Sequence, residues 1–205
     1  MEVLPSRVGI MVLPGVVLFP HSLLPLRIFE PRYRAMLAEA LGSHRMFAVG
    51  MPDPMVLGSR PRPRPVAGLG LIRACVENED GTSNLLLQGV ARVRFETFLR
   101  TTPLFEGRPE RIPSSGELSA EGQALVRRMV GDLLAMAGSR EGLPEGLDKL
   151  LEEMRDVDML TDVIAGTFLH EPEVRQELLE TADLEVRVAK LAEALRLEYP
   201  NLKSL

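Results

Sequence analysis

Three histidines and one cysteine are the side chains of this sequence best suited to nucleophilic or metal chemistry. His21, His44 and His170 are scattered, and none belongs to a His-x-x-x-His pair that would place two imidazoles on one helix face. Cys75 lies inside an apolar run with no histidine nearby to activate it, so we interpret it as a buried thiol. These residues predict no catalytic site, no metal site and no cofactor.

Acidic residues gather at Glu77, Glu79 and Asp80, which could attract a cation. Their spacing lacks the alternating oxygen ligands of an EF-hand loop, so we interpret the group as the solvated tip of a hairpin. The dipeptide Asp80-Gly81 supports this, because glycine accepts the positive φ of a tight hairpin turn. The sequence also contains no Gly-x-x-x-x-Gly-Lys-Ser/Thr phosphate-binding loop, so no ATP-driven activity is predicted.

Five large apolar side chains are candidates for contacting an extended peptide. Phe19, Phe29 and Tyr33 belong to one segment, while Met51 and Met55 flank a Pro-Asp-Pro loop, where we expect exposed methionines. Methionine is flexible and polarisable, which suits a surface that accepts many partners. The competing interpretation is core packing, because large aromatic side chains are usually buried and a loop methionine can fold back onto its own domain.

Two prolines, Pro20 and Pro25, bracket a strand-like run. Proline cannot donate a hydrogen bond to a neighbouring strand, so the run is predicted to lie at the edge of a sheet. An edge strand can accept an added strand from a bound polypeptide, a mode that recognises backbone rather than sequence.

Arg60, Arg62 and Arg64 alternate with prolines and form a basic arm that could contact phosphates or acidic segments. No aromatic residue is interleaved to stack on bases, and the chain has a net charge of −5, so nucleic acid is not the favoured ligand. A solvated, semi-rigid spacer between strands is the interpretation we favour.

The elements that must position these residues differ between the two halves of the chain. Residues 1–113 hold 14 basic and 10 acidic side chains, a charge of +4, whereas residues 114–205 hold 10 and 19, a charge of −9. Prolines and phenylalanines also concentrate before residue 113. The change predicts a β-rich domain over 1–113 and a helical domain over 114–205.

Short apolar runs separated by turn signals predict strands in the first half. These runs cover residues 8–13, 23–29, 46–50, 69–76, 85–90, 93–99 and 104–112. One helix is predicted from Pro31 to Gly42, and Gly89 is expected to allow a sharp bend or a close backbone approach between strands. So many short strands need closure or stacking to protect their edges, which favours a small barrel.

Apolar residues at helical spacing predict five helices in the second half. The first begins near Ser119 and the second covers residues 147–154, while Asp158, Pro172 and Asp183 are expected to begin the other three. Short connections between them favour an antiparallel helical bundle.

The apolar segments and the single cysteine indicate the compartment of the protein and whether it associates with a membrane. Because Cys75 is its one cysteine, the chain cannot form an internal disulfide. The apolar run over residues 8–19 lacks a signal-peptide cleavage site, is broken by Pro14 and Gly15, and falls short of the roughly 20 residues that cross a bilayer. We therefore expect a cytoplasmic protein with no membrane partner.

Several segments resemble one known family. Residues 13–20 (LPGVVLFP) and 24–33 (LPLRIFEPRY) are similar to the opening of the N-terminal substrate-binding domain of Lon proteases. Residues 85–95 (LLLQGVARVRF) resemble a later strand pair of that domain, and residues 143–153 and 176–191 resemble its helical segment. These segments occur in the family's order and together span nearly the whole chain.

The resemblance implies an α+β fold, with a PUA-like β-barrel followed by a helical bundle, and a role in holding exposed or unfolded polypeptide. It implies a stand-alone, non-catalytic module without the ATPase and Ser–Lys protease domains of Lon, acting as an adaptor or holdase, with a protease or chaperone complex as a further partner. The expected state is a monomer or weak homodimer. Two alternatives stay open: RNA or nucleotide binding through the basic arm, and docking onto one native partner.

Overall fold

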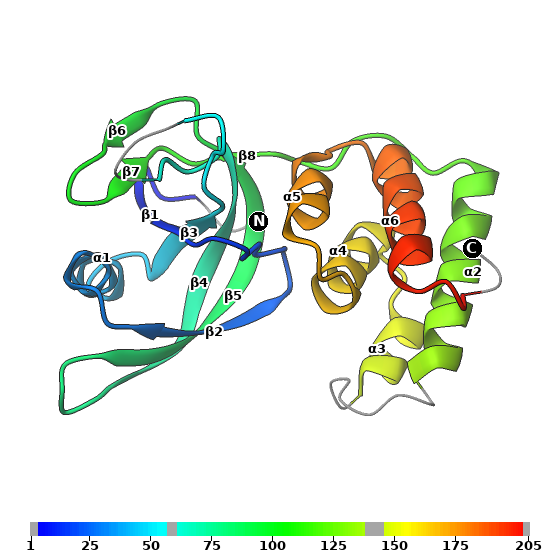
Figure 1. The fold of residues 1–205 in the computed structure, drawn as a ribbon, viewed down its shortest axis with the longest axis horizontal. Helices are drawn as coiled ribbons and strands as arrows, with labels where there is room; N and C mark the ends of the chain where they lie inside the picture. Colours follow the sequence, from blue (N-terminus) through cyan, green and yellow to red (C-terminus); the bar gives the residue numbers. More distant parts are fainter. Residues whose placement is uncertain (1–3, 57–60, 138–145, 203–205) are drawn as a thin grey trace. The chain divides into compact units, whose positions relative to one another are not determined.

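Strands and helices separate along this chain. A computed structural model describes residues 4–56, 61–137 and 146–202, and the chain divides into two units, Met1–Pro113 and Ser114–Leu205. Figure 1 shows the described strands and one helix in the first unit and the other helices in the second. The mixed α+β class predicted from the sequence is confirmed.

The first unit is built on one sheet, which has eight strands within the described residues. Its elements are β1 (Val8–Val12), β2 (Leu23–Ile28), α1 (Pro31–Leu41), β3 (Met46–Gly50), β4 (Val66–Glu77), β5 (Ser83–Arg94), β6 (Phe98–Arg100), β7 (Phe105–Gly107) and β8 (Glu110–Arg111). The strand order is β2-β5-β4-β3-β1-β7-β6, and β8 also pairs with β5. β1 and β3 are parallel, and the other pairs are antiparallel.

The β4–β5 hairpin is longer than the sequence predicted. The sequence predicted separate strands over residues 85–90 and 93–99, but β5 runs without a break from Ser83 to Arg94 because Ala91 still pairs with Leu69 on β4. The predicted turn at the hairpin tip is confirmed, since Gly81 has a φ of 73°.

Two apolar clusters fill the core on opposite faces of the sheet. Because side chains alternate along a strand, Phe47 and Val49 on β3 join one cluster, while Met46 and Ala48 join the other. Helix α1 covers the first cluster with a buried stripe that includes Tyr33, as its apolar spacing predicted. The second cluster includes Phe95 and Phe105, and the Phe98 ring packs against both of them.

The Leu18–Phe19 segment, which precedes β2, passes over one face of the sheet at a glycine of β4 and a glycine of β5. A Cβ atom on Gly68 would lie 1.9 Å from the carbonyl oxygen of Leu18, and one on Gly89 would lie 1.9 Å from that of Phe19. Just after the crossing, the His21 amide donates to the carbonyl of Gly89 (2.8 Å), and the Gly89 amide donates to that of Ser22 (2.9 Å). The close backbone approach predicted for Gly89 is confirmed, and it fixes the start of β2.

The second unit has five helices in its described residues. They are α2 (Ala120–Ala137), α3 (Leu147–Glu153), α4 (Val157–Phe168), α5 (Pro172–Glu180) and α6 (Leu184–Glu198). Helix α6 contacts α2, α4 and α5, and Leu191 and Leu195 on it are fully buried. Pro172 and Asp183 begin α5 and α6 as predicted, and the Asp183 side chain accepts a hydrogen bond from the Val186 amide (3.0 Å).

The cap of α4 differs from the prediction. Asp156, rather than Asp158, is the N-cap, because its carboxylate accepts hydrogen bonds from the amides of Asp158 and Met159 (3.0 and 3.3 Å). Asp158 instead forms an ion pair with the buried Arg187 of α6 and accepts a hydrogen bond from the Ser114 hydroxyl (2.7 Å). This group ties the start of the unit to two of its helices.

The end of α6 is tied to the α4–α5 connection through Glu198. Its carboxylate accepts hydrogen bonds from the backbone amides of His170 and Glu171 and contacts the His170 ring (2.9 Å). Burial raises the pKa of Glu198, but these hydrogen bonds outweigh burial and hold the pKa below its ordinary value. In the described residues, no helix is both long enough and apolar enough to cross a membrane.

We expect Gly89→Ala to lower the free energy of unfolding by at least about 2 kcal/mol, because the added methyl would collide with backbone rather than with a movable side chain. Urea unfolding measures the change. The matched control is Gly131→Ala in α2, where the new Cβ has no neighbour within 4 Å, so helix propensity should stabilise the protein by about 0.5–1 kcal/mol. Equal changes in the free energy of unfolding for the two variants would contradict the conclusion that the close backbone approach at Gly89 excludes a side chain.

Candidate functional site

Three of the five predicted peptide-contacting side chains lie in the core. Phe19 and Tyr33 are buried, and Met51, expected to be exposed in a loop, is only 4% exposed. Met51 directly follows β3, and its carbonyl accepts a hydrogen bond from the Arg64 amide (2.8 Å), so it continues the packed sheet. The expectation of an exposed Met51 was therefore wrong. Phe29 and Met55 are exposed, at 63% and 87%.

The Tyr33 hydroxyl is used inside the protein. It accepts a hydrogen bond from the Val12 amide (3.1 Å) and donates to the Val12 carbonyl (3.3 Å). The guanidinium of Arg32 lies 4.4 Å from the centre of the Tyr33 ring and also pairs with Glu30 (2.8 Å). In this arrangement Tyr33 holds α1 against β1, which leaves Phe29 as the exposed aromatic side chain of this segment.

β2 is one end of the sheet and is apolar on both faces. Leu24 and Leu26 are half-buried and pack against the core cluster under α1. On the other face, Leu23 is 58% exposed and Pro25 is exposed. Phe29 follows directly. We call these five residues, Leu23 to Leu26 and Phe29, the β2 edge.

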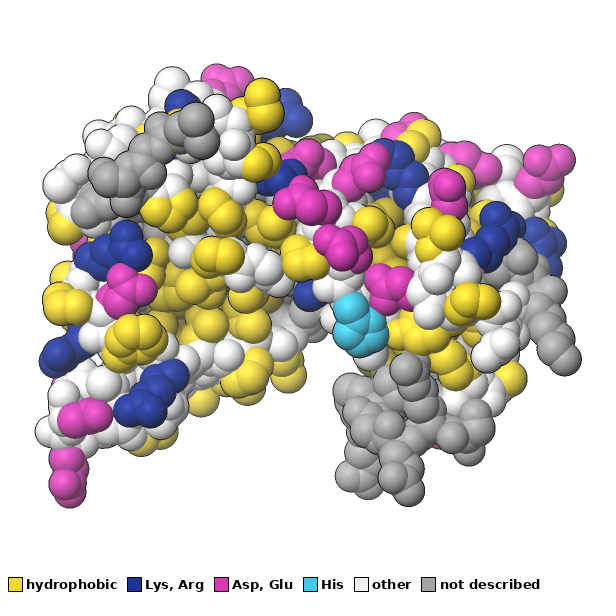
Figure 2. All heavy atoms as spheres, viewed as in Figure 1, with side chains coloured by type: hydrophobic (Ala, Val, Ile, Leu, Met, Phe, Trp, Pro, Cys, Tyr) yellow, Lys and Arg dark blue, Asp and Glu magenta, His cyan; other side chains and the backbone are white. Residues whose placement is uncertain are grey.

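The exposed face of the β2 edge continues across the neighbouring strands. Pro25 pairs with Leu86 on β5, and Leu86 pairs with Ala74 on β4, so three apolar residues form one row across the sheet. Leu23 and Val76, both exposed, lie in the rows on either side. Figure 2 shows hydrophobic side chains gathered on the visible face of this unit.

A strand with one unpaired side and exposed apolar side chains can accept an extended chain. Its free backbone groups can form hydrogen bonds with an added strand, although Pro25 lacks an amide hydrogen and cannot donate. Exposed side chains along the edge can bury apolar residues of the added chain. Arg27 on the same strand pairs with Asp80 at the hairpin tip (3.6 Å), so charge borders the apolar residues.

The loop between β3 and β4 carries the remaining predicted residues. Met55 and Val56 are exposed there, but β4 and β5 separate β3 from β2 in the sheet. Arg62 lies over the Phe98 ring (5.1 Å), and the Arg64 side chain donates to the Pro52 carbonyl (3.4 Å). Arg60 lies outside the described residues. Anion binding by these arginines stays a prediction.

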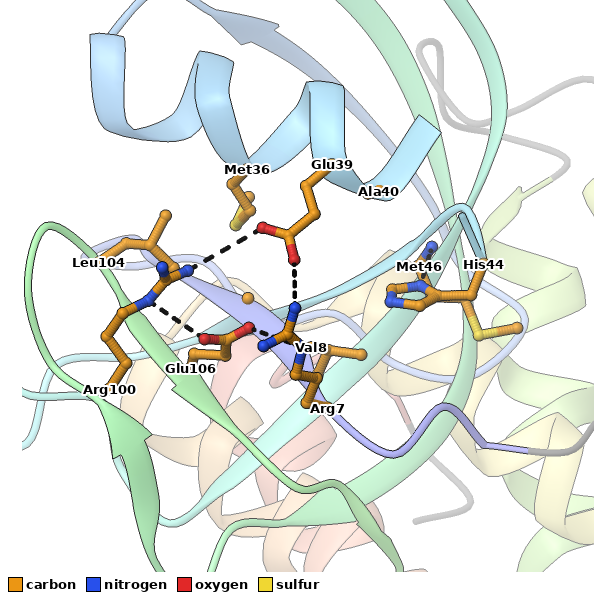
Figure 3. A pocket seen from close by; sticks show the side chains of 11 residues that line it. Arg7, Val8, Met36, Glu39, Ala40, His44, Met46, Arg100, Leu104 and Glu106 are labelled. Carbon is orange, nitrogen blue, oxygen red and sulfur yellow. Dashed lines mark hydrogen bonds and ion pairs between the residues drawn. The ribbon is translucent and has the colours of Figure 1, made fainter. Parts of the chain in front are cut away.

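A pocket between α1 and strands β1, β6 and β7 holds a charge network that the sequence did not reveal. Figure 3 shows Glu39 and Glu106 facing Arg7 and Arg100. Arg7 lies 3.1 Å from Glu39 and 3.5 Å from Glu106, and Arg100 lies 4.0 and 3.1 Å from the same two carboxylates. The four residues come from distant parts of the sequence, so no local pattern marked them.

Little in this pocket is available for a ligand. Its inner space of about 20 Å³ has room for about one water molecule. At its rim, His44 accepts a hydrogen bond from the Met46 amide at Nδ1 (3.1 Å), which requires that nitrogen to be unprotonated. Burial lowers the pKa of His44, although Glu39 opposes the shift. We therefore assign the network to stability rather than to binding.

No group of three His, Cys, Asp or Glu side chains in the described ranges is arranged to hold a metal ion.

Among the exposed apolar residues near β2, the sequence indicated Phe29 but missed Leu23 and Val76. A signal for Leu23 was present, since leucines occupy both alternating positions of a proline-containing strand. Such a strand is apolar on both faces and, if it lies at an edge, must expose one of them.

Comparison with known proteins places this fold in context. Residues 7–196 match the family described as the ATP-dependent protease La (LON) substrate-binding domain. The Lon protease of Desulfosudis oleivorans is 26% identical over 203 residues, which cover 98% of this chain and 25% of that protein. The Lon protease of Dictyoglomus thermophilum is 28% identical over 203 residues, with the same coverage. The chain thus spans about a quarter of the length of these curated relatives.

Two solved structures share the fold. The N-terminal domain of the Mycobacterium avium complex Lon protease aligns with a TM-score of 0.72 at 18% identity, covering 91% of this chain and 96% of that one. The Lon N-terminal domain protein from Xanthomonas campestris aligns with a TM-score of 0.67 at 21% identity, covering 92% and 98%.

We expect Glu106→Gln to lower the free energy of unfolding by about 1–3 kcal/mol, because the 7%-exposed carboxylate forms ion pairs with two arginines. Glu39→Gln is the matched control. Its side chain is 51% exposed, so its loss should cost less than about 1 kcal/mol. Urea titration of both variants measures the difference, and a larger effect at Glu39 would contradict the expectation that the more buried carboxylate contributes more to stability.

Proposed function

The chain belongs to the family of Lon substrate-binding domains, and on this premise we propose that it binds exposed, extended polypeptide along the β2 edge without catalysing a reaction. The observation that carries the proposal is the position of β2 at the end of the sheet, with apolar side chains exposed on it. The family match is to a substrate-binding domain, which supports recognition of protein substrates in general.

Apolar burial would supply the affinity. Leu23 and Phe29 are more than half exposed, and full burial of a leucine or phenylalanine is worth about 1.5–3 kcal/mol. The neighbouring row through Pro25, Leu86 and Ala74 extends the surface beyond a single strand. Because association also costs entropy, a few such contacts support affinities on the order of 1 μM rather than tight binding.

Backbone pairing would make the recognition insensitive to sequence. Hydrogen bonds between an added strand and β2 involve groups that every residue except proline carries. Unfolded chains expose both such backbone and apolar side chains, whereas a folded protein has already paired and buried them. We therefore assign unfolded or partly folded polypeptides as the ligands, and an adaptor or holdase role, in the cytoplasm, as the use of this binding.

The remaining finer assignments belong to the same proposal. We assign residues 1–113 to the PUA-like class of small β-barrels, left open here because, among the described strands, β2 and β6 are the ends of the sheet and do not pair. We assign residues 114–205 to a helical bundle and each of the two parts to a separate domain, with the protein acting as a monomer or weak homodimer. A protease or chaperone complex is the proposed recipient of bound polypeptide.

Nucleic acid is not proposed as a ligand, because Arg62 and Arg64 both contact groups of the protein itself.

We expect the double substitution Leu23→Ser with Phe29→Ser to weaken binding of an unfolded polypeptide at least about tenfold, because two exposed apolar contacts of roughly 1 kcal/mol each are lost. Fluorescence anisotropy of a dye-labelled, disulfide-reduced and alkylated polypeptide measures the affinity. Since both side chains are exposed, the variant should keep its unfolding midpoint.

The matched control is Leu197→Ser on α6, where the side chain is 76% exposed but belongs to the second unit. This variant should bind like the unsubstituted protein. Equal weakening by both changes would show that any exposed leucine serves, and undiminished binding by the double variant would remove the β2 edge as the site. Binding of the same polypeptide in its folded, disulfide-bonded form would instead favour docking to a native partner.

A further inference from the structure

An open groove of about 550 Å³ lies within the second unit. Its apolar residues come from four places in the sequence: Leu118 before α2, Val126 on α2, Val157 at the start of α4 and Leu184 at the start of α6. Val126 is buried, and the other three are half-buried. This volume lies within the range of pockets that hold small molecules or short peptide segments.

Two exposed arginines line the groove. Arg127 on α2 and Arg155 before α4 are exposed, and neither forms an ion pair with any residue that the structure describes. One carboxylate, that of Glu117, also lines the groove. The groove therefore combines an apolar floor with two guanidinium groups, each able to form paired hydrogen bonds with a carboxylate.

The surrounding charge restricts what these arginines can attract. Residues 114–205 carry 10 basic and 19 acidic side chains, so a net charge of −9 surrounds the two guanidinium groups. A nucleic acid, with a charge on every phosphate, would be repelled by the rest of the unit. A short peptide carries only a few charges in total, and its carboxylates can reach the arginines locally, since charges beyond about 10 Å are screened at physiological salt.

We propose that this groove binds a short peptide segment with alternating apolar and acidic side chains, whose apolar side chains lie on the floor formed by Leu118, Val126 and Leu184 and whose carboxylates pair with Arg127 and Arg155. The site is separate from the β2 edge and recognises a different chemistry. The first binds apolar chain through its backbone and side chains, whereas this groove requires negative charge.

The probe is a dye-labelled peptide of alternating leucine and aspartate, measured by fluorescence anisotropy against a matched peptide with asparagine in place of aspartate. The unsubstituted protein should prefer the aspartate peptide. The double variant Arg127→Glu with Arg155→Glu should bind it at least about tenfold more weakly, because two attractive contacts become repulsive. Arg128→Glu is the matched control, because Arg128 is an exposed neighbour that does not line the groove, and it should change the affinity by less than about threefold.

Folding of each variant is checked by its urea unfolding midpoint, and Arg127→Gln with Arg155→Gln provides a second, milder pair that should also weaken binding. The Leu23→Ser/Phe29→Ser variant should retain the aspartate peptide, which separates this site from the proposed β2 function. The inference is overturned if the asparagine peptide binds as tightly, if Arg128→Glu weakens binding as much as the double variant, or if only the β2 variant loses the peptide.

Discussion

The crossing of the Leu18–Phe19 backbone over Gly68 and Gly89 is the constraint on which the first unit depends. Two carbonyl groups approach the β4–β5 pair so closely that no side chain fits at either glycine. The hydrogen bonds that follow, between Gly89 and the backbone of His21 and Ser22, begin the ladder that carries β2. The chain reaches the position beside β5, at the end of the sheet, by passing over Gly68 and Gly89. These two residues leave room for it because they have no Cβ atom.

The position of β2 explains why an apolar strand remains at the surface. The leucines on its inner face complete the core under α1, while Leu23 and Pro25 on its outer face and Phe29 stay exposed. In a protein selected only for stability, an exposed apolar edge invites unwanted pairing. The proposed polypeptide binding would use such an edge, and in this chain Pro25 and the charged Arg27 limit how another strand can add to it.

Much of the fold could be predicted from local sequence, because the decisive signals are local. Pro31, Pro172 and Asp183 begin their helices through fixed φ or side-chain capping, and the strand Met46–Gly50 follows from a short apolar run. Gly89 was identified because a glycine inside a strand indicates close backbone approach. The exposure of Met51 was predicted wrongly because its backbone carbonyl accepts a hydrogen bond from the Arg64 amide, which keeps it in the packed sheet. The composition of the loop does not indicate this contact.

The parts that could not be predicted join residues that are distant in sequence. The Arg7–Glu106 network and the groove containing Arg127 and Arg155 depend on how helices and strands pack, so no spacing rule marks them. Within the β2 edge, local sequence suggested Phe29 and the edge proline, whereas the row from Pro25 through Leu86 to Ala74 required the strand register.

Amide hydrogen exchange in the presence and absence of a saturating unfolded polypeptide tests the central claim most directly, because it locates the bound chain without a substitution. If the polypeptide adds to the free side of β2, exchange should slow in the segment from Ser22 to Phe29, while the β3–β1 pair inside the sheet stays unchanged. Slower exchange confined to the second unit, or no change in β2 at saturation, would contradict the account.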